Sequence, residues 1–135
     1  MQSMDEIKEA FDLVDDWEDR YQLIIDLGKS LPHMPAELKN DSNKVEGCVS
    51  QVWLVSEREG DRLHFQADSD AHIVRGLIGL LLMAFQDKPP EDILDVDIEA
   101  EFQNLGLEKH LSPNRRNGFY AMVGRIREMA NLAAA

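Results

Sequence analysis

The stretch QVWLVSEREGDRLHFQADSD, residues 51–70, decides the fold. Its first part, Gln51–Glu57, holds four consecutive apolar residues and predicts a β-strand. Glu59–Asp61 has the residue types of a tight turn, and Leu63–Ala67 predicts a second strand that pairs back on the first. We therefore expect an antiparallel hairpin near the centre of the chain.

A third strand is expected just upstream of this hairpin. The short run Lys44–Glu46 has room to pair along the edge of Gln51–Glu57, which would make a small three-stranded antiparallel sheet. Gly47 and Cys48 would then lie at the tip of the first of two hairpins. Functional residues concentrate in loops that a rigid scaffold positions, so this turn is the first candidate for a site.

Downstream of the hairpin the pattern changes to that of a helix. Asp68, Ser69 and Asp70 carry side chains of the kind that cap helix N-termini, so we expect them to cap a helix over Ala71–Phe85. Arg75 is the only full charge in that helix. We therefore expect it to be the most buried helix of the fold.

Helices account for most of the remaining chain, as apolar spacings of three and four and residues suited to helix starts indicate. The expected helices are Met4–Val14, a second from Asp15 or Asp16 towards Leu31, one that opens at Pro90, a short one at Glu99–Asn104, and a last one from Ser112 with an apolar stripe at Phe119, Met122, Val123, Ile126 and Ala130. The polar stretch Pro32–Lys44 is expected to be a loop. Helices packed on one face of a small antiparallel sheet define an α+β fold, and a chain of 135 residues predicts one domain, 1–135.

The charge balance excludes some classes of partner. The chain has 26 acidic and 14 basic residues, a formal net charge of −12, which argues against binding a nucleic acid. The longest apolar stretch, Gly76–Phe85, is too short to span a bilayer. The opening MQSMDEIKEAF carries acids where a signal peptide is basic and then apolar. We expect a cytoplasmic protein that does not enter membranes.

Cys48 is the only cysteine, so neither an intrachain disulfide nor a cysteine-rich metal site can form. A lone cysteine is usually buried and inert. Gly47 and Ser50 beside it, however, favour a loop thiol that becomes a nucleophile once it is ionised. The four histidines show no metal-ligand spacing with Cys48, but a stand-alone thiol enzyme, a small cysteine hydrolase or peroxidase, stays open. A purely structural adaptor, for which Cys48 would be dispensable, is the third alternative.

Four blocks of the sequence carry a resemblance to one family. NKVEGCVSQVWL, residues 43–54, resembles the cysteine motif of the SufE family. The blocks on either side resemble that family's other motifs, in order over nearly the whole chain: WEDRYQLIIDLGKSLP (17–32), FQADSDAHIVRGLIGLLL (65–82) and HLSPNRRNGFYAM (110–122).

The resemblance implies a SufE/NifU-like α+β fold and a function in iron–sulfur cluster assembly. SufE-like proteins accept sulfur from a SufS-type cysteine desulfurase, stimulate that enzyme, and pass the sulfur to an iron–sulfur scaffold of the SufBCD type. Cys48 matches the position that holds the persulfide, within a motif that includes Gly47 and Ser50. Asp70 and Arg115 match positions associated with loop control and partner contact.

The resemblance also bears on cofactors and assembly. No cofactor or metal is expected on this chain, and pyridoxal phosphate is expected on the partner desulfurase only. The cognate desulfurase, the choice between the SufE and CsdE subtypes, the final sulfur acceptor and the oligomeric state stay open, a homodimer included.

A persulfide carrier must also protect its thiol from oxidants, because oxidation follows thiolate character and exposure. We expect Cys48 to turn inward against apolar neighbours, where burial raises a thiol pKa, and to become exposed on the partner. Replacing Asp70 by arginine should loosen the resting loop.

Overall fold

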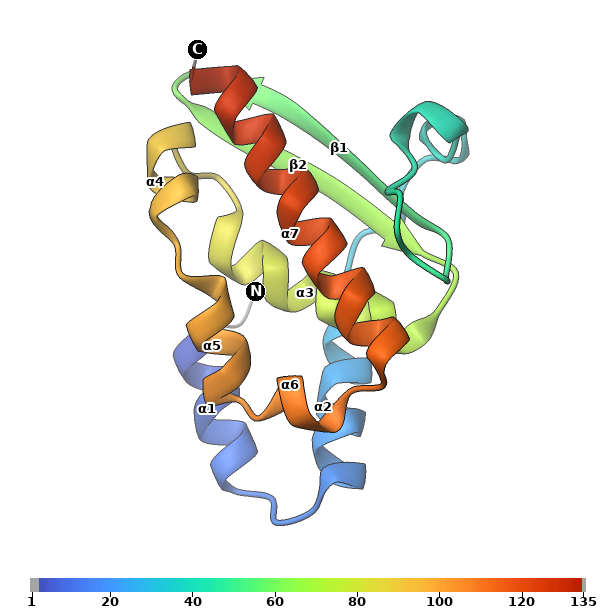
Figure 1. The fold of residues 1–135 in the computed structure, drawn as a ribbon, viewed down its shortest axis with the longest axis vertical. Helices are drawn as coiled ribbons and strands as arrows, with labels where there is room; N and C mark the ends of the chain where they lie inside the picture. Colours follow the sequence, from blue (N-terminus) through green and yellow to red (C-terminus); the bar gives the residue numbers. More distant parts are fainter. Residues whose placement is uncertain (1–2, 135) are drawn as a thin grey trace.

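The computed structural model describes residues 3–134 as an α+β fold with one antiparallel ribbon (Figure 1). Its elements are α1 (Met4–Asp12), α2 (Trp17–Lys29), the short 3-10 helices η1 (Ala36–Leu38) and η2 (Asp41–Asn43), β1 (Val52–Glu59), β2 (Arg62–Ser69), α3 (His72–Phe85), α4 (Pro90–Asp95), α5 (Ile98–Asn104), α6 (Leu107–His110) and α7 (Pro113–Ala134).

The expected central hairpin is confirmed. β1 and β2 pair antiparallel in a register that runs from Val52 opposite Ser69 to Glu59 opposite Arg62. Gly60 makes the turn with a φ of 63°, a left-handed conformation that glycine adopts without strain.

The expected third strand is wrong, because within residues 3–134 the sheet has two strands. Lys44 forms only an isolated bridge with Trp53, and the Val45 amide donates one hydrogen bond of 2.8 Å to the Val52 carbonyl. The chain then turns away at Gly47, whose φ is 89°, so the pairing cannot continue as a ladder. Cys48 follows this turn and lies in an irregular loop instead of at the tip of a second hairpin.

The outer edge of β2 is closed by the chain that follows α3. The Gln86 side-chain amide donates to the Phe65 carbonyl at 2.8 Å and accepts from the Phe65 amide at 2.7 Å. Leu63 forms two backbone hydrogen bonds of 3.0 Å with Asp87 and Lys88. A side chain and a single bridge therefore stand where another strand would pair.

The core lies between the ribbon and the helices. Eleven of the 14 residues of α3 are buried, in keeping with the expectation for this helix. Figure 1 shows α3 near the middle of the molecule and α7 running alongside the ribbon. Val52 and Ala67 of the ribbon line one small cavity together with Ile78 of α3 and Ile126 of α7, so both helices pack on the sheet as expected.

Helices α2 and α3 touch through their backbones. A Cβ atom added to Gly76 would lie 2.1 Å from the Ile24 carbonyl oxygen, and one added to Gly28 would lie 2.7 Å from the Gly76 nitrogen. These two glycines permit the close approach that buries the apolar faces of both helices.

The helix starts follow the sequence in part. Asp16 caps α2 by accepting from the Asp19 amide at 2.9 Å, and Pro90 occupies the first turn of α4, both as expected. The expected capping of α3 by Asp68–Asp70 is wrong: Ala71 is the N-cap residue and no side chain caps that helix. Asp68 and Asp70 are instead engaged by groups from distant parts of the chain, described below. No helix within residues 3–134 combines the length and the apolar character needed to cross a membrane.

Candidate functional site

Cys48 lies in the loop Glu46–Ser50, directly over the first turns of α7. Its thiol is half-buried and approaches the Gly118 carbonyl oxygen of α7 at 3.7 Å. Gly118 is buried and has no side chain, so nothing on that residue separates its carbonyl group from the sulfur. The loop therefore holds the thiol against a helix and not in open solvent.

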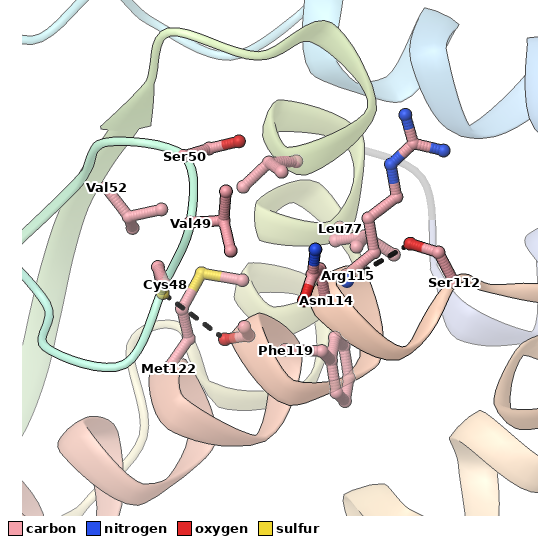
Figure 2. Close-up of a pocket in the computed structure, with 12 residues that line it drawn as sticks. Cys48, Val49, Ser50, Val52, Leu77, Ser112, Asn114, Arg115, Phe119 and Met122 are labelled. Atoms are coloured by element: carbon pink, nitrogen blue, oxygen red, sulfur yellow. Dashed lines mark hydrogen bonds between the residues drawn. The ribbon is translucent and has the colours of Figure 1, made fainter.

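The thiol borders a cavity of about 370 Å³ between the loop, α3 and α7 (Figure 2). The apolar residues that line it are Val49, Val52, Val74, Leu77, Phe119 and Met122, and the others are Cys48, Ser50, Ser112, Asn114, Arg115 and Gly118. No histidine or carboxylate is among these described residues. The groups around the cavity are therefore apolar side chains, amide and hydroxyl groups, and one cationic side chain.

Burial raises the pKa of the Cys48 thiol. A buried thiolate loses hydration, so the neutral thiol is favoured in this conformation. The resting site thus holds a masked nucleophile, which needs exposure or a nearby base before it reacts.

The loop is anchored at both ends. At its start, the Val45 amide donates to the Val52 carbonyl. At its end, the Gln51 amide donates to the Asp70 carboxylate at 3.1 Å, and the Gln51 carbonyl accepts from the Ser69 hydroxyl at 2.7 Å and from the Asp70 amide at 3.3 Å. Asp70 therefore lies outside the cavity, where it holds the residue at which the loop rejoins the sheet.

The other candidate residues from the sequence lie around the same loop and cavity. Arg115 lies in the first turn of α7, where its amide donates to the Ser112 hydroxyl at 3.3 Å. Its side chain lines the cavity, and Figure 2 shows the guanidinium pointing outward, away from the thiol. Ser50, the last residue of the loop, lines the cavity, and Gly47 makes the turn before Cys48. The structure thus brings Cys48, Ser50 and Arg115 to one cavity and places Gly47 and Asp70 at the ends of the loop.

Two residues contact the Cys48 loop in ways that the sequence analysis did not predict. Gly118 interrupts an otherwise helical pattern, and such a glycine signals a close approach of another group. Ser69 was interpreted only as a capping residue, and no local pattern marks it as a partner of Gln51.

Iodoacetamide should label Cys48 of the free protein slowly at pH 7, and the labelling rate should rise with pH over a range above the ordinary thiol pKa of about 8.5. The reason is that burial both raises the pKa of the thiol and restricts access to it. The Asp70→Arg variant should label faster, because it removes the acceptor of the Gln51 amide. Asp15→Arg, the same charge change at an exposed position outside the site, is the control. Wild-type labelling as fast as that of a small-molecule thiol, unchanged by Asp70→Arg, would contradict a closed resting loop.

Fold and site together define a small α+β protein whose one thiol is sheltered in a loop against a helix. The model of the SufE family, described as an Fe-S metabolism associated domain, matches residues 5–130. The chain belongs to the SufE family, a sulfur-transfer family of iron–sulfur metabolism.

Two relatives agree with this membership, and a solved structure shares the fold. The chain is 47% identical over 139 aligned positions to an uncharacterised SufE-like protein of Rhizobium etli, covering 100% of this chain and 94% of the relative. It is 46% identical over 134 positions to one of Rhizobium meliloti, covering 96% of each. The solution structure of a hypothetical protein from Thermus thermophilus superposes with a TM-score of 0.77 at 22% identity, covering 97% of this chain and 95% of the other. That last similarity supports the fold alone.

Proposed function

We propose that this protein accepts sulfane sulfur on Cys48 from a SufS-type cysteine desulfurase, stimulates that enzyme, and carries the sulfur to an iron–sulfur scaffold of the SufBCD type. The observation that carries the proposal is the placement of the only thiol. It lies in a loop anchored at both ends, against an α7 backbone carbonyl and beside a cavity with an apolar floor. Family membership supplies the chemical context.

The transfer step is an exchange between sulfur atoms. The Cys48 thiolate attacks the outer sulfur of a persulfide on the desulfurase cysteine. A new bond forms between Cys48 Sγ and that sulfur, while the bond between the two partner sulfurs breaks and its electron pair leaves with the partner cysteine as a thiolate. Cys48 then holds one extra sulfur atom, and no external oxidant or reductant is consumed.

The exchange requires a Cys48 thiol that is accessible and ionised, and we propose that the bound desulfurase brings about both conditions. In the free protein the thiol is half-buried and its pKa is raised, so attack is slow. Val49, beside the thiol, is 77% exposed and offers an apolar contact to a docking protein. Pyridoxal phosphate, which forms the persulfide from cysteine, would reside on the partner, and this chain needs no cofactor for the exchange.

A stand-alone hydrolase or peroxidase fits the site less well. Such an enzyme needs a base or an activating group beside its thiol. The described residues that line the cavity include no histidine and no carboxylate. This composition supports a thiol that is activated only in a complex.

The direct test is the mass of the intact protein after incubation with a purified cysteine desulfurase and cysteine. The protein should gain the mass of one sulfur atom, and mild reduction with a thiol should remove it. Omitting the desulfurase should give no added mass. A protein that gains no sulfur while the desulfurase turns over cysteine would overturn the proposal.

Arg115→Ala should weaken stimulation of the desulfurase and leave thermal stability nearly unchanged. The guanidinium is exposed and contributes little to folding, but it can pair with a carboxylate or carbonyl of a partner. A charge-assisted hydrogen bond is worth about 1.5–3 kcal/mol, so half-maximal stimulation should need at least about tenfold more protein. Arg125→Ala, on the same helix but paired with Glu128 at 3.1 Å, is the matched control. Equal titration curves for both variants and the wild type would remove Arg115 from the contact.

A further inference from the structure

We propose that Ser69 is a positioning residue for Cys48, and that its hydroxyl sets how often the Cys48 loop leaves α7. Only the consequence of this proposal for sulfur transfer rests on the proposed function. Its central prediction concerns the free protein.

Both hydrogen-bonding roles of the Ser69 hydroxyl are occupied. The Oγ atom donates to the Gln51 carbonyl at 2.7 Å and accepts from the Ala71 amide at 3.2 Å. Because a carbonyl carries no proton, the single proton of the hydroxyl must point to Gln51. The residue is 7% exposed, so water has little access to compete for this bond. A fixed donor thus holds the chain three residues beyond Cys48.

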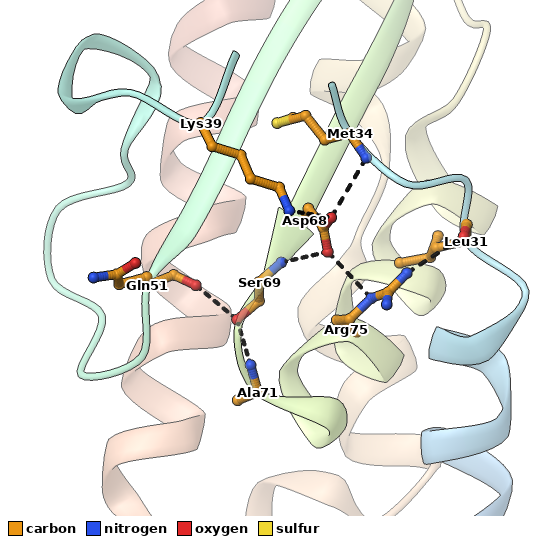
Figure 3. Close-up of polar contacts among 8 residues, drawn as sticks. All are labelled: Leu31, Met34, Lys39, Gln51, Asp68, Ser69, Ala71 and Arg75. Atoms are coloured by element: carbon orange, nitrogen blue, oxygen red, sulfur yellow. Dashed lines mark hydrogen bonds and ion pairs between the residues drawn. The ribbon is translucent and has the colours of Figure 1, made fainter. Parts of the chain in front are cut away.

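Asp68 holds Ser69 in place, as Figure 3 shows. Its carboxylate is 2% exposed and accepts from the Ser69 amide at 2.8 Å. Arg75 Nε and Lys39 Nζ each lie 3.2 Å from its oxygens, and the Met34 amide donates to it at 3.4 Å. The buried charge is therefore compensated by two cations and two amides, contributed by the loop after α2, by α3 and by β2 itself.

The ionisation of Asp68 agrees with this geometry. Burial alone would raise its pKa, but the hydrogen bonds from Ser69, Lys39 and Met34 and the nearby Arg75 hold the pKa below its ordinary value. Asp68 is therefore charged near neutral pH. Arg75 also donates to the Leu31 carbonyl at 3.3 Å, which joins the chain just after α2 to the same cluster.

These contacts give the Cys48 loop a fixed point at Ser69. Ser69 cannot follow the loop, because its own backbone is held by Asp68. Release of the loop at Gln51 must therefore break the bond between Ser69 and Gln51. Losing this bond should increase the population of the open loop, and with it the reactivity of Cys48.

The test is the rate at which iodoacetamide labels Cys48 in the free protein at one pH, with no desulfurase present. Ser69→Ala should label about fivefold faster than the wild type, which corresponds to about 1 kcal/mol at about 1.4 kcal/mol per tenfold, the net worth of one hydrogen bond. Ser69→Thr keeps the hydroxyl and should label at the wild-type rate.

Ser30→Ala is the matched control, since it removes a hydroxyl that donates to the Leu27 carbonyl at 2.8 Å outside the site. It should lower the melting temperature modestly and leave labelling unchanged. Labelling of Ser69→Ala at the wild-type rate, or an equal increase in Ser30→Ala, would overturn the positioning role. Because no partner is used, failure of sulfur transfer in the mass experiment would leave this result intact, and the reverse also holds.

Discussion

Replacing Gly76 by alanine should destabilise the protein by at least about 3 kcal/mol, a large part of the roughly 5–15 kcal/mol that stabilises an ordinary domain. The added Cβ would lie 2.1 Å from the Ile24 carbonyl oxygen and 2.6 Å from the Ile24 carbonyl carbon. Both are backbone atoms, so no side-chain rotation relieves the overlap. Helices α2 and α3 would have to separate, and the apolar faces between them would lose contact. Urea denaturation followed by circular dichroism measures the change.

Gly124→Ala is the matched control for this prediction. Gly124 lies in α7, and apart from the adjoining backbone of α7 itself no atom is within 4 Å of the position its Cβ would take. Alanine is favoured over glycine in a helix by roughly 0.5–1 kcal/mol, so this variant should be slightly more stable than the wild type. Equal stabilities for the two variants would show that α2 and α3 do not pack as described.

Cys48→Ser should abolish stimulation of the desulfurase, to the rate of the enzyme alone, while the protein stays folded. Serine replaces a half-buried thiol with a smaller group that can still donate to the Gly118 carbonyl. We therefore expect the free energy of unfolding to change by no more than about 1 kcal/mol. A hydroxyl is not ionised near neutral pH and cannot take up sulfane sulfur, and the chain has no other thiol. Sulfide release by the desulfurase, with increasing amounts of each variant, measures the effect.

Ser56→Ala, a change at an exposed position of β1, is the control and should stimulate like the wild type. If Cys48→Ser also stimulates normally, the protein acts as an adaptor and the persulfide mechanism is wrong. If Cys48→Ser is unfolded, the thiol has a structural role that its exposure does not suggest.

The fold was largely predictable because most of its signals are local. The apolar run 52–55 and the turn residues that follow it were sufficient for the hairpin, and the nearly uncharged run 71–85 was sufficient for a buried helix. The prediction of a third strand was wrong although Val45 does form an edge contact with Val52. The turn at Gly47 ends this pairing after a single bridge. A sequence does not show how far a short edge segment stays in register before it turns away.

The site was predictable only in part, because groups distant in the sequence hold its residues in place. Cys48 stood out through its loop context, but the group beneath it, Gly118, is 70 residues away in the chain. Asp68 and Asp70 match the local pattern of helix caps, yet their carboxylates bind Arg75, Lys39 and the Gln51 amide instead. Long-range partners that outcompete a local cap are not encoded in the neighbouring residues.

The side chain of Gln86 has a consequence for how copies of this protein behave when crowded together. A backbone strand at that position would offer a further row of donors and acceptors on its far side, from which sheets can grow from one molecule into the next. A side-chain amide satisfies Phe65 in the same way but ends there. At Phe65 the outer edge of β2 is therefore capped by a side chain that offers no further backbone hydrogen bonds to another strand. This should disfavour fibrous self-association through that edge.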